Sequence, residues 1–351
     1  MRRFSGFKFV PPGLHLVTWS TGSQGSSSGP AAIPIRHGLI RILKAKQRVV
    51  LTYDPDTETV HEREEIISDD SLRTLDKELA PYPFEELEKW KALTSHINER
   101  NLDEVVPEGR VDGMMPVIGE ESEKGESEIG GEVDRGADGL HFVQFRLKRS
   151  WRDGAVGQEV TRYARDKSWL LGDVVTNRLE RGESGSLVHL QAKLISDPYR
   201  LLGQLQLAFV LLLQLSSYGG LTVYKRILSL FTRSSSILST PAHYMPEGPD
   251  ISGLFRAVVV AIAAQIQSIP SGSFETELPE FDLFYLDEIE SLRENLSSTP
   301  WRDQVSASWK RLQSAGKTWR WDIDNLDSPG PVDGSDEEDE EGEYAPVVVD
   351  L

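Results

Sequence analysis

Cysteine is absent from this sequence of 351 residues. Without it the chain forms no disulfide, holds no thiolate zinc site and has no cysteine nucleophile, an absence typical of a reducing compartment. Long apolar runs are absent as well. Met1–Lys8 contains no stretch of signal-peptide length, and the most apolar segment, Leu201–Leu215, is interrupted by Gln204, Gln206 and Gln214. We therefore expect an intracellular protein that has no membrane partner.

Basic residues are fewer than acidic residues. Lys and Arg number 38 against 56 Asp and Glu, which gives a formal net charge of −18. Because phosphate contacts require a basic surface, we expect no direct binding of nucleic acid. Much of the negative charge lies in two tracts, Gly119–Gly139 and Asp336–Glu341, so the rest of the sequence is closer to neutral.

Motifs for catalysis and metal binding are also missing. The seven histidines are scattered, with no pair spaced to meet on a helix face and no HExxH motif. Ser314–Thr318 ends like a phosphate-binding loop, but Arg311 occupies the place of the first glycine, and Gly182–Ser186 lacks the closing glycine of a nucleophile elbow. The carboxylates of Asp287–Glu290 indicate a solvated helix face. We expect no enzyme, no cofactor and no metal site.

Short β-strands are predicted near the N-terminus. Phe7–Val10, Leu14–Trp19 and Arg48–Tyr53 are rich in β-branched and aromatic residues and are bounded by turn residues. They predict a small antiparallel sheet. The Gly/Ser tract Thr21–Gly29 has too little apolar content to pack and predicts a loop.

The hydrophobic period changes to that of a helix after Asp69. Apolar residues recur at helical spacing on both sides of Pro81–Pro83: Leu72, Leu75, Leu79, Leu87, Trp90, Leu93 and Ile97. This pattern predicts two helices that are joined by a proline elbow and cover one face of the sheet. Residues 119–140 lose all periodicity and predict an acidic flexible linker.

The sequence after the linker is helical in pattern. After a predicted strand at His141–Leu147, six helices are expected at Tyr163–Glu180, Leu201–Leu215, Leu221–Phe231, Leu254–Ile269, Phe281–Leu296 and Gln304–Trp319. The predicted fold is therefore a two-domain α+β protein. A small antiparallel β-rich domain with covering helices spans residues 1–118, an all-α domain spans 141–326, and a disordered acidic tail spans 327–351.

The tail ends in a strong strand former. Pro346 is followed by Val347, Val348 and Val349, directly after an acidic spacer. Strand addition takes its affinity from main-chain hydrogen bonds, so this peptide is suited to join the sheet of another protein. A frayed tail, or one docked on its own domain, is the alternative reading.

Two further clusters are candidates for binding. Trp319 and Trp321 predict core packing that closes the helical domain, with an exposed aromatic anchor for a partner as the alternative. The second cluster is a local basic patch formed by Arg146, Lys148, Arg149 and Arg152. In an acidic chain such a patch favours contact with an acidic protein surface or with the chain's own acidic tracts.

Serines near charged segments are candidates for regulation. Ser335 is followed directly by acidic residues, which predicts an acidophilic-kinase site. A phosphate there would favour release of a partner or extend the spacer. Ser234, Ser235 and Ser236, in a predicted loop of the helical domain, are the alternative positions.

Four blocks of the sequence together carry a resemblance to a known family. They are Phe4–His15; Leu79–Pro83 with Trp90, Leu93, Thr94 and Ile97; Leu202–Val210 with Tyr218, Lys225 and Leu228; and Trp319–Asp322 with Ala345–Leu351. Gln204 stands where the family usually has Glu, and Tyr224 where it usually has Trp. In this order and spacing the blocks resemble the Aar-two family, assembly factors of the spliceosomal U5 small nuclear ribonucleoprotein.

The resemblance implies a protein that binds other proteins and catalyses nothing. Its helical domain would be similar to the VHS superhelix, and its partner would be the large U5 scaffold protein, at the RNase H-like and Jab/MPN-like domains. The tail would bridge these two domains as an added strand and keep the helicase that unwinds U4/U6 from joining early. Release is linked in the family to phosphorylation. A monomer found in the cytoplasm and nucleus is expected, with Pro346–Val349, Trp319 and Trp321 as partner-binding residues.

The sequence departs from the family at its start. Family members carry a segment with a GTxFGID-like motif before the PPG block, and this sequence begins where that segment ends. Either the start is misassigned or the first strands are missing, which would leave a sheet edge uncovered. The alternative function is a VHS-type helical adaptor in vesicle traffic or ubiquitin binding, which would bind acidic-dileucine peptides or ubiquitin through the helical domain alone.

Overall fold

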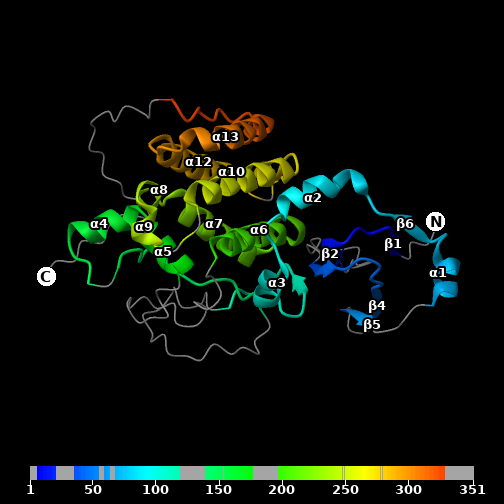
Figure 1. The fold of residues 1–351 in the computed structure, drawn as a ribbon. Helices are drawn as coiled ribbons and strands as arrows, with labels where there is room; N and C mark the ends of the chain where they lie inside the picture. The colour runs from blue at the N-terminus through cyan, green and yellow to red at the C-terminus, as the bar shows by residue number, and fades with distance from the viewer. Residues whose placement is uncertain are drawn as a thin grey trace, which may run out of the picture.

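Small β-sheets lie at one end of the molecule and a helical array at the other (Figure 1). A computed structural model describes residues 6–20, 35–54, 59–63, 68–118, 139–152, 154–176, 197–246, 248, 250–276, 278 and 280–328. The predicted α+β organisation, with strands first and helices after, is confirmed. The Gly/Ser tract, nearly all of the predicted linker and the tail beyond Ser328 lie outside the described residues, so the predicted domain boundaries stay a prediction.

The described strands form three small sheets. The first contains β2 (Gly13–Ser20), β3 (Arg36–Leu43) and β7 (Arg110–Asp112) in antiparallel order; the second pairs β4 (Val50–Asp54) with β5 (Thr59–Arg63), also antiparallel; the third pairs β1 (Gly6–Lys8) with β6 (Leu79–Pro81) in parallel. In the first sheet Leu14 lies opposite Ile42, and Leu16 lies opposite Ile40. The predicted strands are confirmed, but the pairing of β1 with β6 is parallel and corrects the prediction of a purely antiparallel region.

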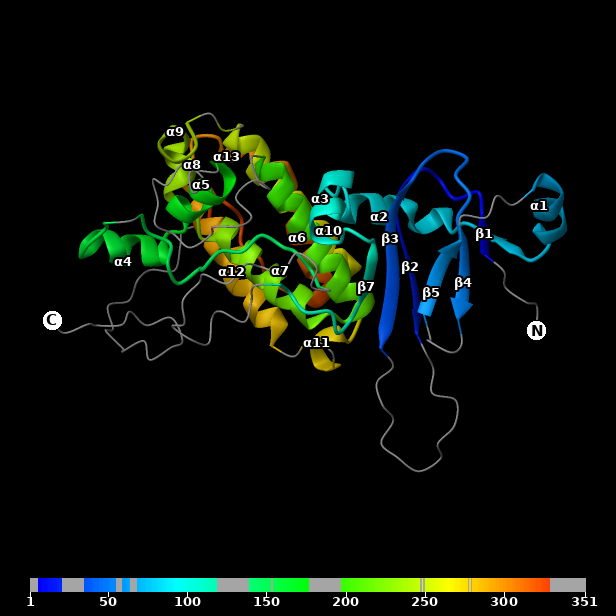
Figure 2. The same cartoon turned by 90° about the horizontal axis from the view of Figure 1, so that it is seen from below.

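The helices around the proline elbow differ from the prediction. They are α1 (Asp69–Leu75), the 3-10 turn η1 (Phe84–Glu86), α2 (Leu87–Leu93) and α3 (Glu99–Val105). No residue of α1 is buried, and Leu79 belongs to β6, so α1 does not cover a sheet. By contrast, α2 runs from the strands toward α10 (Ile251–Ser268), as Figure 2 shows. The indole Nε1 of Trp90 donates to the Leu14 carbonyl at 2.6 Å and fixes α2 to β2.

The strand predicted at His141–Leu147 is wrong. Phe142, Val143 and Phe145 are buried in the core, which explains the strand-like pattern, but the segment has no strand neighbour among the described residues. Its backbone is satisfied differently, because the Val143 amide donates to Oε1 of Gln204 at 2.9 Å. A side chain of a buried helix therefore takes the role that a partner strand would have.

The helix predicted at Tyr163–Glu180 is interrupted. The structure contains α4 (Gln158–Arg165) and α5 (Ser168–Thr176), and residues 177–180 lie outside the described range. The break falls at Asp166, whose carboxylate accepts the Ser168 amide at 2.9 Å and so caps the new helix. The hydrophobic period continues through the break, which is why the sequence alone suggested one helix.

The remaining predicted helices are confirmed. They are α6 (Pro198–Leu215), α7 (Tyr218–Thr232), α10, α12 (Phe281–Ser297) and α13 (Arg302–Gly316), the last followed by the 3-10 turn η5 (Lys317–Trp319). Short helices α8 (Ser236–Ser239), α9 (Pro241–Tyr244) and α11 (Ser273–Thr276) connect them. Three of these helices begin at residue types that favour an N-cap. The side chains of Asp197, Ser217 and Asp250 accept amide hydrogen bonds at the starts of α6, α7 and α10.

Helix α6 joins the strands to the helical array. It is buried along almost its whole length, and two of its three glutamines bind backbone amides from other parts of the chain. Oε1 of Gln206 accepts the His96 amide at 2.7 Å, and Gln204 holds Val143 as described above. Gly113 lies so close to the end of α6 that a Cβ there would be 2.4 Å from the Leu215 carbonyl oxygen, and a Cβ at Gly38 of β3 would be 3.4 Å from the Leu215 side chain. One continuous core therefore includes Ile40 on the sheet and the leucines of α6.

Helix α10 is long and apolar enough to cross a membrane by length and composition. It lies inside the helical array, however, between α6 and α13 (Figure 1). Leu254, Phe255 and Val258 are fully buried there. Its apolar surface therefore serves the protein core.

Candidate functional site

The two predicted binding tryptophans lie together at the end of α13. Arg320 adopts a left-handed conformation (φ 61°), and the Trp321 amide donates to the Gly316 carbonyl at 3.1 Å, which turns the chain back over the helix end. The ring of Phe274 lies 4.5 Å from that of Trp319 and 5.6 Å from that of Trp321, and Nε1 of Trp319 donates to the Ile266 carbonyl at 3.3 Å.

The exposure of Trp319 and Trp321 is compatible with both predicted roles, core packing and partner binding. Trp319 and Trp321 are partly buried and pack against the core, as the prediction of helix closure required. Each also keeps an exposed edge. Their role in partner binding stays a prediction.

The chain after Trp321 returns along α13 and is held at several points. The Trp309 indole donates to the Asp324 carbonyl at 2.8 Å, and the Gln313 amide donates to the Ile323 carbonyl at 2.9 Å. Arg302 at the start of α13 pairs with Asp327 at 3.0 Å. The tail thus departs from a fixed point, while Ser335 and Pro346–Val349 lie outside the described residues.

The candidate serines of the helical domain lie elsewhere, between α7 and α8. Ser234 is fully buried and donates to the Leu230 carbonyl at 2.6 Å. The amides of Ser235 and Ser236 donate to the Asp166 carboxylate at 3.1 and 3.3 Å. A kinase would reach Ser234 only after local opening. Oγ of Ser236 accepts a hydrogen bond from Nη2 of Arg162 at 3.0 Å, so a phosphate there would meet a cation as well as Asp166. The switch role of these serines stays a prediction.

A buried lysine lies beside this serine turn and was not singled out from the sequence. The Lys167 ammonium donates to the Leu147 carbonyl at 2.8 Å, to Oγ of Ser150 at 3.1 Å and to the Ala164 carbonyl. Burial, with a smaller contribution from the positive charge of Arg233, lowers the pKa of Lys167 to about 8. The lysine satisfies carbonyls where α4 ends, which is a structural role.

The predicted basic patch is only partly available. Arg152 donates through Nε and Nη2 to the two carboxylate oxygens of Glu159, at 2.6 and 3.2 Å. The hydrogen bond from Arg152 lowers the pKa of the Glu159 carboxyl. This pair removes one charge of the patch from binding an acidic surface.

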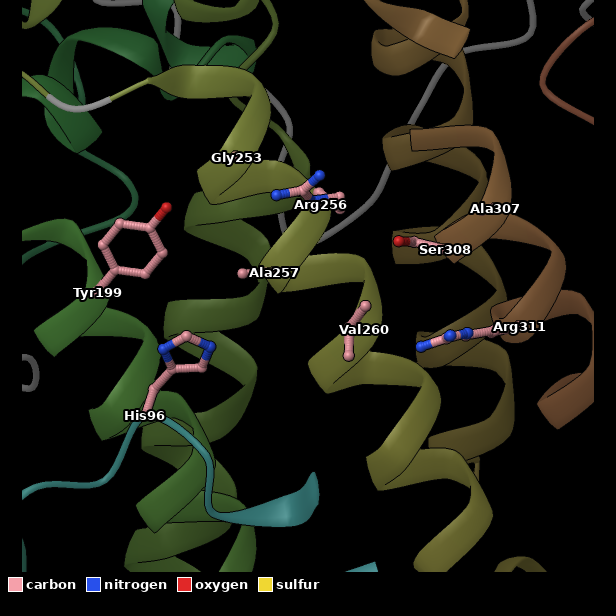
Figure 3. A pocket seen from close by; sticks show the side chains of 9 residues that line it. All are labelled: His96, Tyr199, Gly253, Arg256, Ala257, Val260, Ala307, Ser308 and Arg311. Carbon is pink, nitrogen blue, oxygen red and sulfur yellow. The ribbon is translucent and has the colours of Figure 1, made fainter. Parts of the chain in front are cut away.

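A groove along α10 was not predicted from the sequence. One cavity of about 490 Å³ is lined by residues that include His96, Tyr199, Gly253, Arg256, Ser308 and Arg311, and a second of about 340 Å³ shares Val260 and Arg311 with it. We call this continuous depression the α10 groove. In Figure 3, His96 and Tyr199 lie on one side of α10, and Ser308 and Arg311 on α13 lie on the other.

Two stacked rings line the α10 groove on one side. The rings of His96 and Tyr199 lie 5.5 Å apart and within 19° of parallel. Burial lowers the pKa of His96, with Asp197 opposing the shift, so the imidazole is neutral at pH 7. Burial also raises the pKa of Tyr199. In the sequence, Gly253, Ala257, Val260 and Ala264 fall on one face of α10, but this spacing alone does not distinguish a groove from a buried face.

No group of three or more His, Cys, Asp or Glu able to hold a metal ion occurs in the part of the chain that the structure describes. The geometry instead offers surfaces for protein contact: the aromatic pair, the fixed departure point of the tail and the α10 groove.

Comparisons with known proteins agree with the resemblance. Residues 1–107 match the family model described as the AAR2 N-terminal domain, and residues 142–324 match the AAR2 C-terminal repeat region. The chain is 24% identical over 378 residues to the mouse protein AAR2 homolog, covering 99% of this chain and 87% of that protein. The human homolog is 25% identical over 265 residues, covering 67% of this chain and 64% of that protein, and the Caenorhabditis elegans homolog is 26% identical over 292 residues, covering 78% and 73%.

Proposed function

This chain belongs to the AAR2 family, and from that membership we propose that it is an assembly factor of the U5 small nuclear ribonucleoprotein in pre-mRNA splicing. It acts by binding a protein and has no enzymatic activity. Its partner is the large U5 scaffold protein, whose RNase H-like and Jab/MPN-like domains it bridges. Bound there, it blocks early entry of the helicase. We further propose a VHS-type superhelix for the helical part and a monomer found in the cytoplasm and nucleus.

The observation that supports the proposal is that the chain is held against the helical domain up to the start of the tail. The segment after Trp321 is held along α13 as far as Ser328, whose carbonyl accepts a hydrogen bond from Arg293 at 3.0 Å. Residues 329–351 follow, and they end with the strand-forming peptide Ala345–Leu351. A rigid body that carries a tethered strand former is suited to strand addition, because main-chain hydrogen bonds provide affinity once the tether has provided proximity.

Deletion of the strand-forming peptide tests the mechanism. The scaffold's C-terminal domains are immobilised, and binding of the full chain is compared with binding of a chain that ends at Tyr344. We expect a loss of at least tenfold, about 1.4 kcal/mol or more. Equal affinity would remove the tail from the mechanism and leave the family assignment untouched.

Proline substitution separates strand addition from simple hydrophobic contact. Neighbouring residues of a strand point their amides to opposite edges, so Val347→Pro and Val348→Pro each remove a donor from a different edge. If the tail pairs along one edge, one of the two variants loses affinity; if it bridges two domains with both edges, both do. The matched variants Val347→Thr and Val348→Thr keep the β-branched shape and are expected to bind nearly as wild type. Full affinity in both proline variants would contradict strand addition.

The aromatic pair provides a second proposed contact. We expect Trp321→Ala to weaken scaffold binding at a temperature well below the melting midpoint of the variant, since the exposed ring edge is lost there without unfolding. Affinity equal to wild type under those conditions would limit Trp319 and Trp321 to closing the helical domain.

Release is proposed to follow phosphorylation at Ser335. A phosphate adds close to two negative charges beside the tail as it approaches its partner. Ser335→Asp is expected to weaken binding and Ser335→Ala to leave it unchanged. If Ser335→Asp binds the scaffold as well as wild type does, the release role of this serine is wrong.

A further inference from the structure

The α10 groove has a floor that leaves room for a bound chain. Gly253, Ala257, Val260 and Ala264 follow one another at intervals of four, three and four residues, so their short side chains line one face of the helix. Ala307 continues this surface on α13. Short side chains on facing helices create a depression that a peptide backbone fits.

The rim of the groove is cationic. Arg256 on α10 and Lys310 and Arg311 on α13 are exposed, and Arg311 extends toward Val260 across the groove (Figure 3). None of these three makes an ion pair or a side-chain hydrogen bond with the residues that the structure describes. The carboxylate of Asp250 lies close to the groove, where it accepts hydrogen bonds from Ser252 and the amide of Gly253. The hydrogen bond from Ser252 and, to a smaller extent, the positive charge of Arg256 lower the pKa of Asp250, so Asp250 balances part of the charge of Arg256. Lys310 and Arg311 have no such carboxylate among the described residues, although the net charge of the chain is −18.

We propose that the α10 groove binds the chain's own acidic run, Asp336–Glu341. Charge complementarity is the first argument, because six consecutive carboxylates would meet three cations, two of which, Lys310 and Arg311, have no carboxylate partner among the described residues. Opposite charges near a protein surface attract strongly enough to order a tethered segment, although salt weakens the attraction. This inference does not depend on the proposed binding of the U5 scaffold.

The length of the connecting chain is the second argument. The last described residue, Ser328, follows Asp327, which is paired with Arg302 at the start of α13. Arg302 and Arg311 are nine residues apart on one helix, about 14 Å along its axis at a rise of 1.5 Å per residue, and they lie on opposite faces of a helix roughly 10 Å across. Eight residues lead from Ser328 to Asp336, and an unfolded chain of that length spans roughly 16 Å on average. The acidic run thus reaches the groove around α13, at an effective concentration in the millimolar range.

Self-docking changes what the tail presents. With Asp336–Glu341 in the groove, the segment Ala345–Leu351 is held near the helical domain, and the groove is closed to acidic segments of other proteins. A partner that takes the tail must compete with this intramolecular contact. The charge of the run and its tether thereby control the availability of both the groove and the strand former.

Carbodiimide cross-linking of the full chain tests the proposal, because it joins a lysine amine to a carboxylate only when the two are in contact. We expect Lys310 to be cross-linked to Asp336–Glu341 in monomeric protein at low salt, and the yield to fall at least fivefold in 1 M salt, where the Debye length is about 3 Å. The double variant Arg256→Glu/Arg311→Glu should lose this cross-link. The matched control Lys317→Glu/Arg320→Glu changes the charge equally, outside the groove, and should retain it.

Three outcomes would overturn the proposal. A Lys310 cross-link that survives the groove double variant would show that the contact is incidental. A cross-link found only in covalent dimers would assign the groove to a second copy of the chain. No Lys310 cross-link in wild-type protein would leave the groove to an acidic segment of another protein.

A second measurement guards against unfolding of the double variant. A labelled peptide of residues 330–343 is added to full chain in which all six carboxylates of the run are replaced by Asn or Gln. We expect it to bind this chain at least tenfold more tightly than wild type, whose groove is occupied. Equal binding to both would contradict self-docking.

Discussion

Gly203→Ala is expected to destabilise the protein because α6 and the segment before α3 approach each other too closely for a side chain. A Cβ at Gly203 would lie 2.4 Å from the His96 carbonyl oxygen and 2.6 Å from Oδ1 of Asn101. The His96 oxygen belongs to the backbone and cannot rotate away. To admit a methyl group, the segment from His96 to Asn101 must move off α6.

The loss of unfolding free energy in Gly203→Ala can be worked out from the contacts that this movement breaks. Overpacking of a core costs about 1–3 kcal/mol. Two hydrogen bonds would also be lost, from Nδ2 of Asn101 to the Arg200 carbonyl at 2.9 Å and from the His96 amide to Gln206 at 2.7 Å, each contributing about 1 kcal/mol. Alanine regains about 1 kcal/mol of helix propensity over glycine. The free energy of unfolding should therefore fall by about 2–4 kcal/mol.

Urea unfolding followed by tryptophan fluorescence measures this loss, and Gly316→Ala in α13 is the matched control. Its Cβ would meet the end of the flexible Ile323 side chain at 2.5 Å, which can move aside, so stability should stay within about 1 kcal/mol of wild type. Faster hydrogen exchange at the His96 amide in Gly203→Ala would place the damage at this contact. If Gly203→Ala is as stable as the control, the close approach of α6 to this segment is wrong.

Three further predictions concern charge and cooperativity. Glu104→Gln should lower the free energy of unfolding by about 3 kcal/mol or more, because the buried Arg200 guanidinium loses its counter-charge; Glu88→Gln, from an exposed pair with Lys91, should change it by less than about 0.5 kcal/mol in the same urea assay. The pKa of Lys167 is about 8 in the folded protein against 10.5 for an ordinary lysine, so the unfolded chain holds more protons between these values. Wild type should therefore gain stability relative to Lys167→Met as the pH rises from 8 to 10.5, and a constant difference in melting midpoint would contradict this. Finally, the core shared by β3 and α6 predicts one unfolding transition by circular dichroism and fluorescence, and two separated transitions would mean that the two parts unfold independently.

Local pattern was sufficient for most of the secondary structure. Leu201–Leu215 is apolar apart from three glutamines and is found in the buried helix α6, while Asp197 supplies the cap that begins it. Leu14–Trp19 lies in β2, as its β-branched and aromatic residues predicted. Such segments are specified by period and cap alone, because few neighbours compete for their backbone hydrogen bonds.

The wrong secondary-structure predictions fall where residues distant in the sequence make the hydrogen bonds of the backbone. His141–Leu147 alternates like a strand, yet its amide at Val143 binds Gln204 from another part of the chain. Asp166 ends one helix and begins the next, and it also holds the amides of Ser235 and Ser236, about seventy residues away. The sequence contains these residues, but not the information that they meet.

The candidate surfaces divide in the same way. The strand-forming tail and its acidic run are visible in the sequence, because composition alone defines them. The α10 groove is not, because it needs α13 beside α10, with Arg311 placed across from Val260. Small residues at helical spacing occur in many buried helices, so the spacing by itself does not indicate an opening.

The sequence by itself determined the order of strands and helices, the absence of cysteine chemistry, the acidic character of the chain and the family to which its motifs point. These properties depend on residue type and near neighbours. Only the tertiary structure decided that strands and helices share one core through α6, that Gln204 and Gln206 bind backbone amides from elsewhere, and that Arg256, Lys310 and Arg311 line the same groove. Those facts depend on which distant residues the fold brings into contact, and local propensity carries no information about such contacts.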